Sequence, residues 1–293
     1  MYYIISNPIS GRKKHNYKKI KALYQYLDDN HIEYTLFESK YFKHPLEIAQ
    51  QITTSNDSGN IIVIGGDGTF NEVVNGIKDL SKWNIGLIPS GSGNDFAKCL
   101  NLPIHNLLEC LKIIINGHVA QFDYILVNDM KCVNVLGTGI DVTVLNNFEK
   151  HQKMKGSFRY FYSLLEALLH LKWYEFDVSL DDSEFVHKKG FLITLCNGSH
   201  IGGGIPICPN AKANDQKLEF VFVDQIKKRK LPLYLLKLMT GKIFQIKEAQ
   251  HVYCEKAIFQ DQKSFTLQID GNLINNQRQY CCKIIKKGLN MYQ

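Results

Sequence analysis

Three short segments rich in glycine, serine and asparagine hold the residues of this sequence that are best suited to chemistry. They are Gly65–Thr69, which reads Gly-Gly-Asp-Gly-Thr, Pro89–Gly93 and Asn7–Gly11. Glycine lets the backbone approach an anion closely, and successive N–H groups at a turn or a helix N-terminus can bind phosphate. A plain strand–helix connection is the simpler interpretation of a lone Gly-Gly pair. Three glycines around one aspartate, directly after the aliphatic run 61–64, favour a phosphate site instead.

The segments around these loops alternate between short strands and longer helical patterns. We expect strands at 2–6, 33–37, 60–64 and 84–88, with helices at 18–30, 45–53, 70–77 and 95–100. Such alternation is typical of a parallel sheet covered by helices on both faces. Loops at the carboxyl ends of neighbouring strands share one edge of such a sheet, where ligands usually bind. The pattern therefore predicts a polyphosphate lying across the three loops.

The second part of the chain has a different character. Strand-like segments separated by turns recur at 122–127, 131–136, 176–180, 189–196, 217–223 and 265–270. Two helical patterns, at 158–173 and 231–240, interrupt them. We therefore expect two domains, an α/β domain over 1–120 and a β-rich domain over 121–293.

Composition limits the functional classes only weakly. The 293 residues carry a formal net charge of +7, which could suit nucleic acid, an anionic membrane or a phosphorylated ligand. No nucleic-acid-binding motif accompanies the charge, so we expect no nucleic-acid partner. The eight cysteines show no CxxC spacing and are expected to be reduced thiols, which favours the cytoplasm. The apolar start is too short for a signal peptide, and no run reaches the ~18 residues of a membrane span.

The motifs together resemble the catalytic-domain family of the diacylglycerol kinases, in its soluble bacterial form. The resemblance rests on the Asn7–Gly11 loop, on Gly65–Gly76 and on Pro89–Phe96, and it continues through 134–141, 197–204, 209–218 and 270–272. Sphingosine kinases are relatives, and NAD kinases share the Gly-Gly-Asp-Gly element. The resemblance implies a three-layer α/β nucleotide-binding domain with a parallel sheet. It also implies a β-sandwich-like lipid-binding domain, after which the last residues return to the first domain.

The resemblance further implies ATP and Mg²⁺ as cofactors. The residues expected to contact ATP are Asn7, Pro8, Ser10, Gly11, Ser39, Gly65, Gly66, Asp67, Gly68, Thr69, Asn71, Gly91, Ser92 and Asn94. Asp67 would also organise the catalytic Mg²⁺. A structural Mg²⁺ would bind Asp215 and the backbone carbonyls of Lys212 and Lys217. Gln216 stands where relatives have glycine, so an ordinary polar turn remains the alternative there.

One position departs from the family. Relatives carry Asp-Gly-Glu, whose glutamate is the proposed general base, but this chain has Asp270-Gly271-Asn272. An amide cannot act as that base, so Asp67 or Asp95 would have to accept the proton. We expect a lipid kinase that transfers the γ-phosphate of ATP to a hydroxyl, with diacylglycerol giving phosphatidic acid. The alternatives are a weak or inactive protein that binds nucleotide and lipid, or a kinase of another lipid such as a sphingoid base.

Two segments could reach a lipid surface from the side. Basic residues precede the apolar helical patterns at 158–173 and 231–240, which suits an anionic membrane. Core helices with a solvated basic flank are the alternative for each segment. We expect a cytoplasmic protein that associates peripherally with membrane and meets its lipid substrate there. A homodimer is left open.

Overall fold

The chain folds into two compact units. The structure, a computed structural model, describes residues 1–8, 13–151, 153–154 and 156–293. The first unit contains Met1–Asp123 and Lys286–Gln293, and the second contains Tyr124–Ile285. The chain enters the second unit within strand β5 (Val119–Val127) and returns within the long strand β13 (Asn272–Tyr292).

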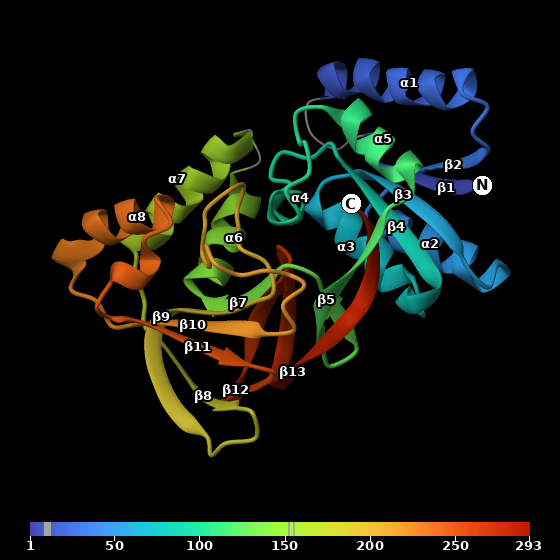
Figure 1. The fold of residues 1–293 in the computed structure, drawn as a ribbon. Coiled ribbons are helices and arrows are strands. Elements are labelled where there is room, and N and C mark those ends of the chain that lie inside the picture. Colours follow the sequence, from blue (N-terminus) through green and yellow to red (C-terminus); the bar gives the residue numbers. More distant parts are fainter. Residues whose placement is uncertain (9–12, 152, 155) are drawn as a thin grey trace. The chain divides into compact units, whose positions relative to one another are not determined.

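The first unit is a parallel sheet with helices on both sides. Its strands are ordered β2-β1-β3-β4 followed by the end of β13, and each neighbouring pair is parallel. Helices α1 and α5 lie on one side of this sheet, and α2 and α3 lie on the other (Figure 1). The elements are β1 (Tyr2–Ser6), α1 (Lys13–Asp29), β2 (Tyr34–Glu38), α2 (His44–Ser55), β3 (Gly59–Gly65), α3 (Asp67–Gly76), the 3-10 helix Leu80–Lys82, β4 (Trp83–Pro89), α4 (Asp95–Cys99) and α5 (Leu107–Asn116).

Strand β3 shows why the sequence forms this arrangement. Its residues Ile61 to Ile64 are all aliphatic and at most 1% exposed. A strand reads as a continuous apolar run when helices cover both faces of its sheet. The run also places Gly65 and the following turn at the carboxyl end of a central strand.

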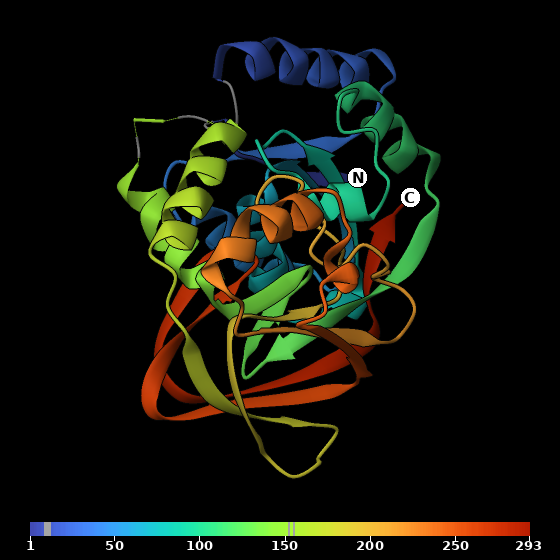
Figure 2. The ribbon, with the colours of Figure 1, turned by 90° about the vertical axis from the view of Figure 1, so that its left-hand side faces the viewer.

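The second unit is built on an antiparallel sheet with three helices packed on it. Its main strand order is β11-β10-β9-β7-β12-β13, with β8 beside β12 and β9. Strands β12 and β13 form a long hairpin (Figure 2). The elements are β6 (Met130–Cys132), β7 (Val135–Gly139), α6 (Ile140–Lys150), α7 (Gly156–Leu169), β8 (Tyr174–Leu180), β9 (Val186–Cys196), β10 (Leu218–Asp224), the 3-10 helix Lys228–Lys230, α8 (Leu231–Met239), the 3-10 helix Ile243–Gln245, β11 (Ala249–Cys254) and β12 (Lys256–Ile269).

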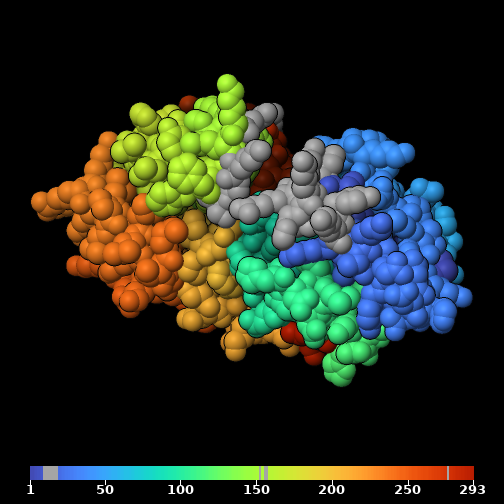
Figure 3. Space-filling model, turned by 90° about the horizontal axis from the view of Figure 1, so that it is seen from above, coloured from blue at the N-terminus to red at the C-terminus, as the bar shows by residue number. Residues whose placement is uncertain are grey.

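Two buried clusters lie on opposite faces of this sheet. Along β10, Val221 and Val223 belong to the cluster that the helices cover, whereas Phe220 and Phe222 belong to a cluster of strand residues. This alternation follows from the two-residue period of a strand. Helices α7 and α8 lie side by side at the surface of the unit (Figure 3).

The strand expected at 131–136 is wrong as a single element. The carboxylate of Asp270 accepts hydrogen bonds from the N–H groups of Val133 (2.7 Å), Asn134 (3.0 Å) and Val135 (3.1 Å). The N–H groups of Val133 and Asn134 are thus directed to Asp270 and not to a neighbouring strand, so the segment divides into β6, which ends at Cys132, and β7, which begins at Val135. The helix expected at 158–173 also ends earlier, at Leu169, because the chain must extend before β8 begins at Tyr174.

Among the described residues, no helix is both long enough and apolar enough to cross a membrane.

Candidate functional site

The turn between β3 and α3 presents open backbone at one glycine and tight packing at another. A Cβ atom at Gly65 would lie 2.5 Å from Cβ of Thr69, so this glycine is required by the turn itself. A Cβ atom at Gly68 would have no described heavy atom within 4 Å. Gly68 also lies in the first turn of α3, whose N-terminal N–H groups favour anions. The backbone at Gly68 is therefore accessible to a phosphate.

Hydrogen bonds tie this turn to the ends of β1 and β2. The Asn7 side chain donates to Thr69 Oγ1 at 2.9 Å, and the Asn7 backbone N–H donates to the Ile64 carbonyl at 2.9 Å. The backbone N–H of Ser39 donates to the Ser6 carbonyl at 2.8 Å. Asn7, Ser39 and Thr69 are thus brought to one edge of the sheet. Pro8 is exposed beside them, and the predicted contacts Ser10 and Gly11 lie outside the described residues.

The loop after β4 packs directly on the β3–α3 turn. A Cβ atom at Gly91 would lie 2.5 Å from the Cα atom of Gly66, so the two backbones are in contact. Asn94 has φ 55° and closes the loop: its Oδ1 accepts from the Gly91 N–H and its Nδ2 donates to the Gly91 carbonyl, both at 3.0 Å. The Asn94 side chain thus shapes the loop. Ser92 stands exposed at its tip.

Two carboxylates sit at helix N-termini in the same region. Asp67 opens α3, and its Oδ1 accepts a hydrogen bond from the backbone N–H of Phe96 at 3.1 Å. Asp95 opens α4, is 6% exposed, and lies 3.3 Å from the Lys98 ammonium. Negative charge is favourable at both positions because of the helix dipole. Asp67 is only half-buried, so it is the better placed of the two to meet a ligand.

A cavity of about 390 Å³ adjoins the loop after β4. It is lined by Lys19, Pro89, Ser90, Gly91, Ser92, Gly93, Asn94, Lys98, Ile104, His105 and Leu107. Two ammonium groups beside a glycine–serine loop suit a polyphosphate, so the residues present fit a nucleotide. Sequence reasoning could have found Lys98, because it lies three residues after Asp95 on a predicted helix and hence on the same face. Lys19 and His105 had no such signal, because only the fold brings α1 and the 104–107 segment to the loop.

The predicted structural Mg²⁺ loop is a tight turn that offers hard oxygens. The Asp215 N–H donates to the Lys212 carbonyl at 3.3 Å, and Asp215 Oδ1 accepts from the Lys217 N–H at 3.1 Å. Carboxylate and carbonyl oxygens fit Mg²⁺. Gln216 has φ 63°, a conformation that favours glycine, which is the residue that the family resemblance implies at this position.

Asn272 begins β13 directly after a turn that Asp270 stabilises. Besides the three N–H groups already described, the Cys132 thiol donates to Asp270 Oδ1 at 3.2 Å. The Gly271 N–H donates to Gln268 Oε1 at 3.0 Å. These contacts commit Asp270 to holding the turn, so Asp270 cannot replace the missing glutamate.

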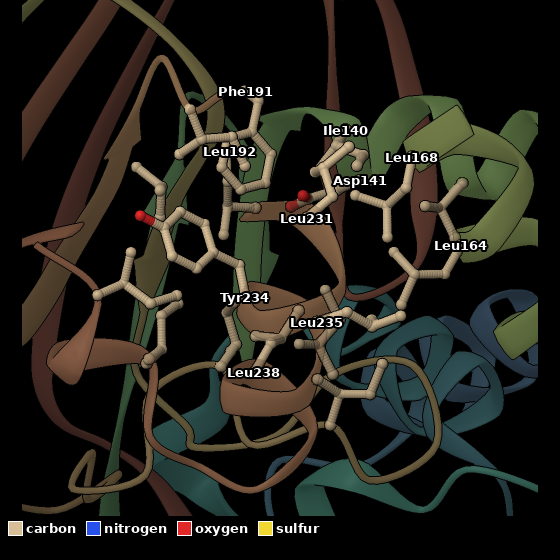
Figure 4. A pocket seen from close by; sticks show the side chains of 18 of the residues that line it. Ile140, Asp141, Leu164, Leu168, Phe191, Leu192, Leu231, Tyr234, Leu235 and Leu238 are labelled. Carbon is tan, nitrogen blue, oxygen red and sulfur yellow. The ribbon is translucent and has the colours of Figure 1, made fainter. Parts of the chain in front are cut away.

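The second unit contains an apolar pocket with one carboxyl group (Figure 4). Side chains from α6, α7, α8 and the sheet surround Asp141, which is 4% exposed. Burial raises the pKa of Asp141 to about 7, while hydrogen bonds from its own backbone and from Gln268 oppose the rise. The enclosed space is about 50 Å³, far below the ~300–1,000 Å³ of a drug-sized site. A long ligand could enter only if the surrounding helices separate.

The outer faces of the two helices that cover this pocket are also apolar. The large apolar side chains that they expose, among the described residues, are Phe158, Phe161, Tyr162, Leu165, Leu169, Leu233, Leu236 and Met239. Residues 227–229, just before α8, are exposed and basic. The basic side chain of Arg159, on α7, is instead engaged within the unit. Its guanidinium donates to the Phe148 carbonyl and lies 3.7 Å from the centre of the Phe148 ring.

Each of the two units is similar to a known protein domain. The family model of the diacylglycerol kinase catalytic domain matches residues 1–127, and that of the YegS C-terminal NAD kinase beta sandwich-like domain matches 134–280. A Staphylococcus epidermidis protein named "Putative lipid kinase" is 33% identical over 174 residues, 58% of this chain and 56% of that protein. A "Putative lipid kinase" of Staphylococcus aureus is 31% identical over 188 residues, 61% of this chain and 60% of that protein. The matched region thus spans less than two thirds of these curated relatives.

Solved structures show the same fold. A crystal structure of a diacylglycerol kinase from Bacillus anthracis superposes with a TM-score of 0.78 at 22% identity, covering 99% of this chain and 96% of that one. An NAD kinase from Archaeoglobus fulgidus, solved in complex with ATP, gives a TM-score of 0.54 at 14% identity, covering 100% of this chain and 94% of that one. Because its two units match the two family models in order, the chain belongs to the diacylglycerol kinase catalytic-domain family.

Proposed function

We propose that this protein is an ATP-dependent lipid kinase that converts diacylglycerol to phosphatidic acid. The observation that carries the proposal is the combination of two sites in one chain. The first unit has the open backbone at Gly68 and the lysine-lined cavity, which suit a polyphosphate. The second unit has an apolar pocket in which Asp141 is the acidic residue among the described lining residues; with the surrounding helices separated, it would suit a lipid tail and a small polar group.

In the proposed reaction, the lipid hydroxyl oxygen forms a bond to the γ-phosphorus, the bond from that phosphorus to the β-phosphate oxygen breaks, and ADP leaves. Bound Mg²⁺ would neutralise charge on the phosphates. The loops orient the donor, and Lys19 and Lys98 supply further positive charge. Asp67 accepts the proton of the lipid hydroxyl, because it is half-buried whereas Asp95 is buried beside Lys98.

The pocket favours a neutral lipid. With a pKa of about 7, Asp141 is largely protonated below neutral pH and can then donate a hydrogen bond to an ester or hydroxyl oxygen. The amine of a sphingoid base would instead require the ionised carboxylate. Diacylglycerol is therefore the first substrate to test, and a sphingoid base is the second.

We further propose a peripheral membrane contact through α7 and α8. Their outward apolar side chains and the exposed basic residues 227–229 suit an anionic lipid surface. The same two helices cover the apolar pocket, so insertion of their outer faces into lipid would bring the pocket next to the substrate.

The test is transfer of labelled phosphate from ATP, with Mg²⁺, into detergent–lipid micelles. The lipids compared are diacylglycerol, ceramide, sphingosine and undecaprenol. We expect labelled phosphatidic acid from the native protein and none from Asp67→Ala. If no lipid is labelled, although the protein is folded and binds ATP, the kinase proposal fails and a nucleotide- and lipid-binding role takes its place.

A further inference from the structure

Four side chains with metal-binding chemistry gather on one face of the sheet in the second unit. Cys196 on β9 lies directly opposite Glu219 on β10. His251 on β11 lies opposite Val221, two residues along β10 from Glu219 and hence on the same face. Cys208 reaches this face from the segment between β9 and β10. Three strands and one loop therefore contribute to a single cluster.

The atoms are close and mostly buried. Glu219 Oε2 lies 2.7 Å from Cys208 Sγ and 2.5 Å from His251 Nε2. The three possible ligand atoms lie within 4.8 Å of one another. Cys208 is fully buried and Glu219 is 2% exposed, whereas the His251 side chain is 23% exposed at the edge of the sheet. The Cys196 thiol donates a hydrogen bond to Thr194 Oγ1 at 3.6 Å.

The cluster leaves one polar atom unsatisfied. Glu219 Oε1 is buried and has no hydrogen-bond partner among the residues that the structure describes. A thiol and an imidazole both contact its other oxygen. An unsatisfied buried polar group costs ~1–3 kcal/mol, and more when it is charged. A cation held by both carboxylate oxygens would satisfy Oε1 and use the sulfur and nitrogen at the same time.

We propose that Cys208, Glu219 and His251 form a binding site for Zn²⁺. Thiolate sulfur, imidazole nitrogen and carboxylate oxygen are the ligands that zinc uses in proteins. Zinc–ligand distances of ~2.0–2.3 Å place tetrahedral ligand atoms about 3.5 Å apart, so the contacts to Glu219 Oε2 need to lengthen by only about 1 Å. The ion would enter past the partly exposed His251.

Binding changes the protonation of the ligands in a defined way. The Cys208 thiol loses its proton to solvent as the Zn–S bond forms, and Glu219 binds as the carboxylate. His251 binds through Nε2 as the neutral imidazole, with its proton on Nδ1. Zinc affinity should therefore fall as the pH is lowered.

The site is distinct from the proposed Mg²⁺ loop and does not depend on the kinase proposal. The turn around Asp215 offers only oxygen atoms, which suit a hard cation, whereas this cluster includes sulfur and nitrogen. Zinc would join β10 and β11 to the segment before Cys208. Ile205 and Ile207 in that segment line the apolar pocket, so the ion would hold one wall of the pocket in place.

The experiment is metal analysis of the full chain, purified under reducing conditions without a histidine tag, equilibrated with Zn²⁺ and then desalted. We expect one zinc per chain in the native protein and in Cys281→Ser, which changes an exposed thiol outside the cluster. We expect loss of zinc in Cys208→Ser, Glu219→Gln and His251→Asn. Co²⁺ in place of zinc should give a thiolate charge-transfer band and tetrahedral d–d bands, which Cys208→Ser abolishes.

Two further arms keep the test decisive. Zinc should raise the melting temperature of the native protein and of Cys281→Ser but not that of Glu219→Gln. Because glutamine has nearly the same shape as glutamate, Glu219→Gln should fold, and it remains a usable control even if Cys208→Ser does not fold. Cys196→Ser cannot form a Cys196–Cys208 disulfide, so it should still bind zinc. The proposal would be overturned if the native protein and Cys196→Ser contained no more zinc per chain than Glu219→Gln does. A cobalt spectrum of the native protein without a thiolate band would overturn it as well.

Discussion

The Asp67 carboxylate accepts a hydrogen bond from the backbone N–H of Phe96 at 3.1 Å. Asp67 opens α3 and Phe96 lies in the first turn of α4, so one side chain connects the turns that follow two neighbouring parallel strands. This aspartate therefore has a structural task in addition to its proposed chemistry. Substitutions of Asp67 must therefore distinguish the loss of this hydrogen bond from the loss of the proposed catalytic role.

Asp67→Asn keeps an oxygen that can accept from Phe96 but removes the charge and the base. We expect unfolding free energy within about 1 kcal/mol of the native value, with phosphate transfer lowered ~10²–10⁴-fold. Asp67→Ala also loses the hydrogen bond and should cost about 1–2 kcal/mol more. Urea unfolding and the lipid phosphorylation assay measure the two effects. Unchanged turnover in Asp67→Asn would contradict the assignment.

The two glycines of the β3–α3 turn give a matched pair of substitutions. Gly68→Ala meets open space within a helix, so stability should be retained or raised by about 0.5–1 kcal/mol. Its methyl group would occupy the space where a phosphate approaches, so ATP affinity should fall. Gly65→Ala would clash with Thr69 and should lower stability itself. Calorimetric ATP titration beside thermal unfolding would distinguish them, and equal ATP binding by Gly68→Ala and native protein would refute the phosphate site.

Asn272→Glu introduces the carboxylate that the family resemblance implies after Asp270 and Gly271. General-base help is worth ~10²–10⁴-fold, so we expect turnover with diacylglycerol to rise by roughly the lower end of that range. Asn272→Gln is the control, since it has the length of glutamate without a basic group. A gain in both variants would point to packing, and a gain in neither would show that another group already supplies the base.

Asp141 should make stability fall as pH rises through the weakly acid range. Its pKa is raised from 3.8 to about 7, so between these values the folded protein binds the proton that the unfolded chain has lost. The loss of unfolding free energy caused by ionising the buried Asp141 is absent below about pH 4. It is complete above about pH 7, where it approaches about 4 kcal/mol. Asp141→Asn removes this dependence. The difference in urea unfolding free energy between the two proteins, measured from pH 4 to 8, should follow that curve; a flat difference would show that the carboxyl is not buried as described.

The outer face of the helices α7 and α8 can be tested against lipid vesicles. Leu169→Glu and Leu236→Glu replace side chains that are 69% and 60% exposed, so folding should be little affected. Burial of one leucine is worth ~1.5–3 kcal/mol, and each change should weaken binding to anionic vesicles by at least roughly tenfold. Phe42→Glu, at a residue 71% exposed in the first unit, is the control. Equal co-sedimentation of all three variants with native protein would exclude this contact surface.

Much of the first unit could be predicted from local patterns. The aliphatic run 61–64 and the glycine-rich turn after it specify a buried strand and its connection, because hydrophobic periodicity and backbone freedom act over a few residues. Each expected strand there lies within about two residues of an observed one. Helices α5 and α6, strand β11 and the 21-residue strand β13 were not anticipated. Helix α5 does carry a local signal, because Asn106 caps it and Leu107, Cys110, Leu111 and Ile114 follow helical spacing.

The remaining features were decided by contacts between distant residues. No short sequence pattern predicts that the Asp270 carboxylate interrupts the strand at Val133, or that Lys19 lines the cavity beside Ser92. The register of β9, β10 and β11 likewise brings Cys196, Glu219 and His251 to one face. The sequence by itself determined the family, the order of the main elements and the loops suited to phosphate. Only the tertiary structure decided which distant charges and thiols meet, because strand register and helix packing are set by the whole core.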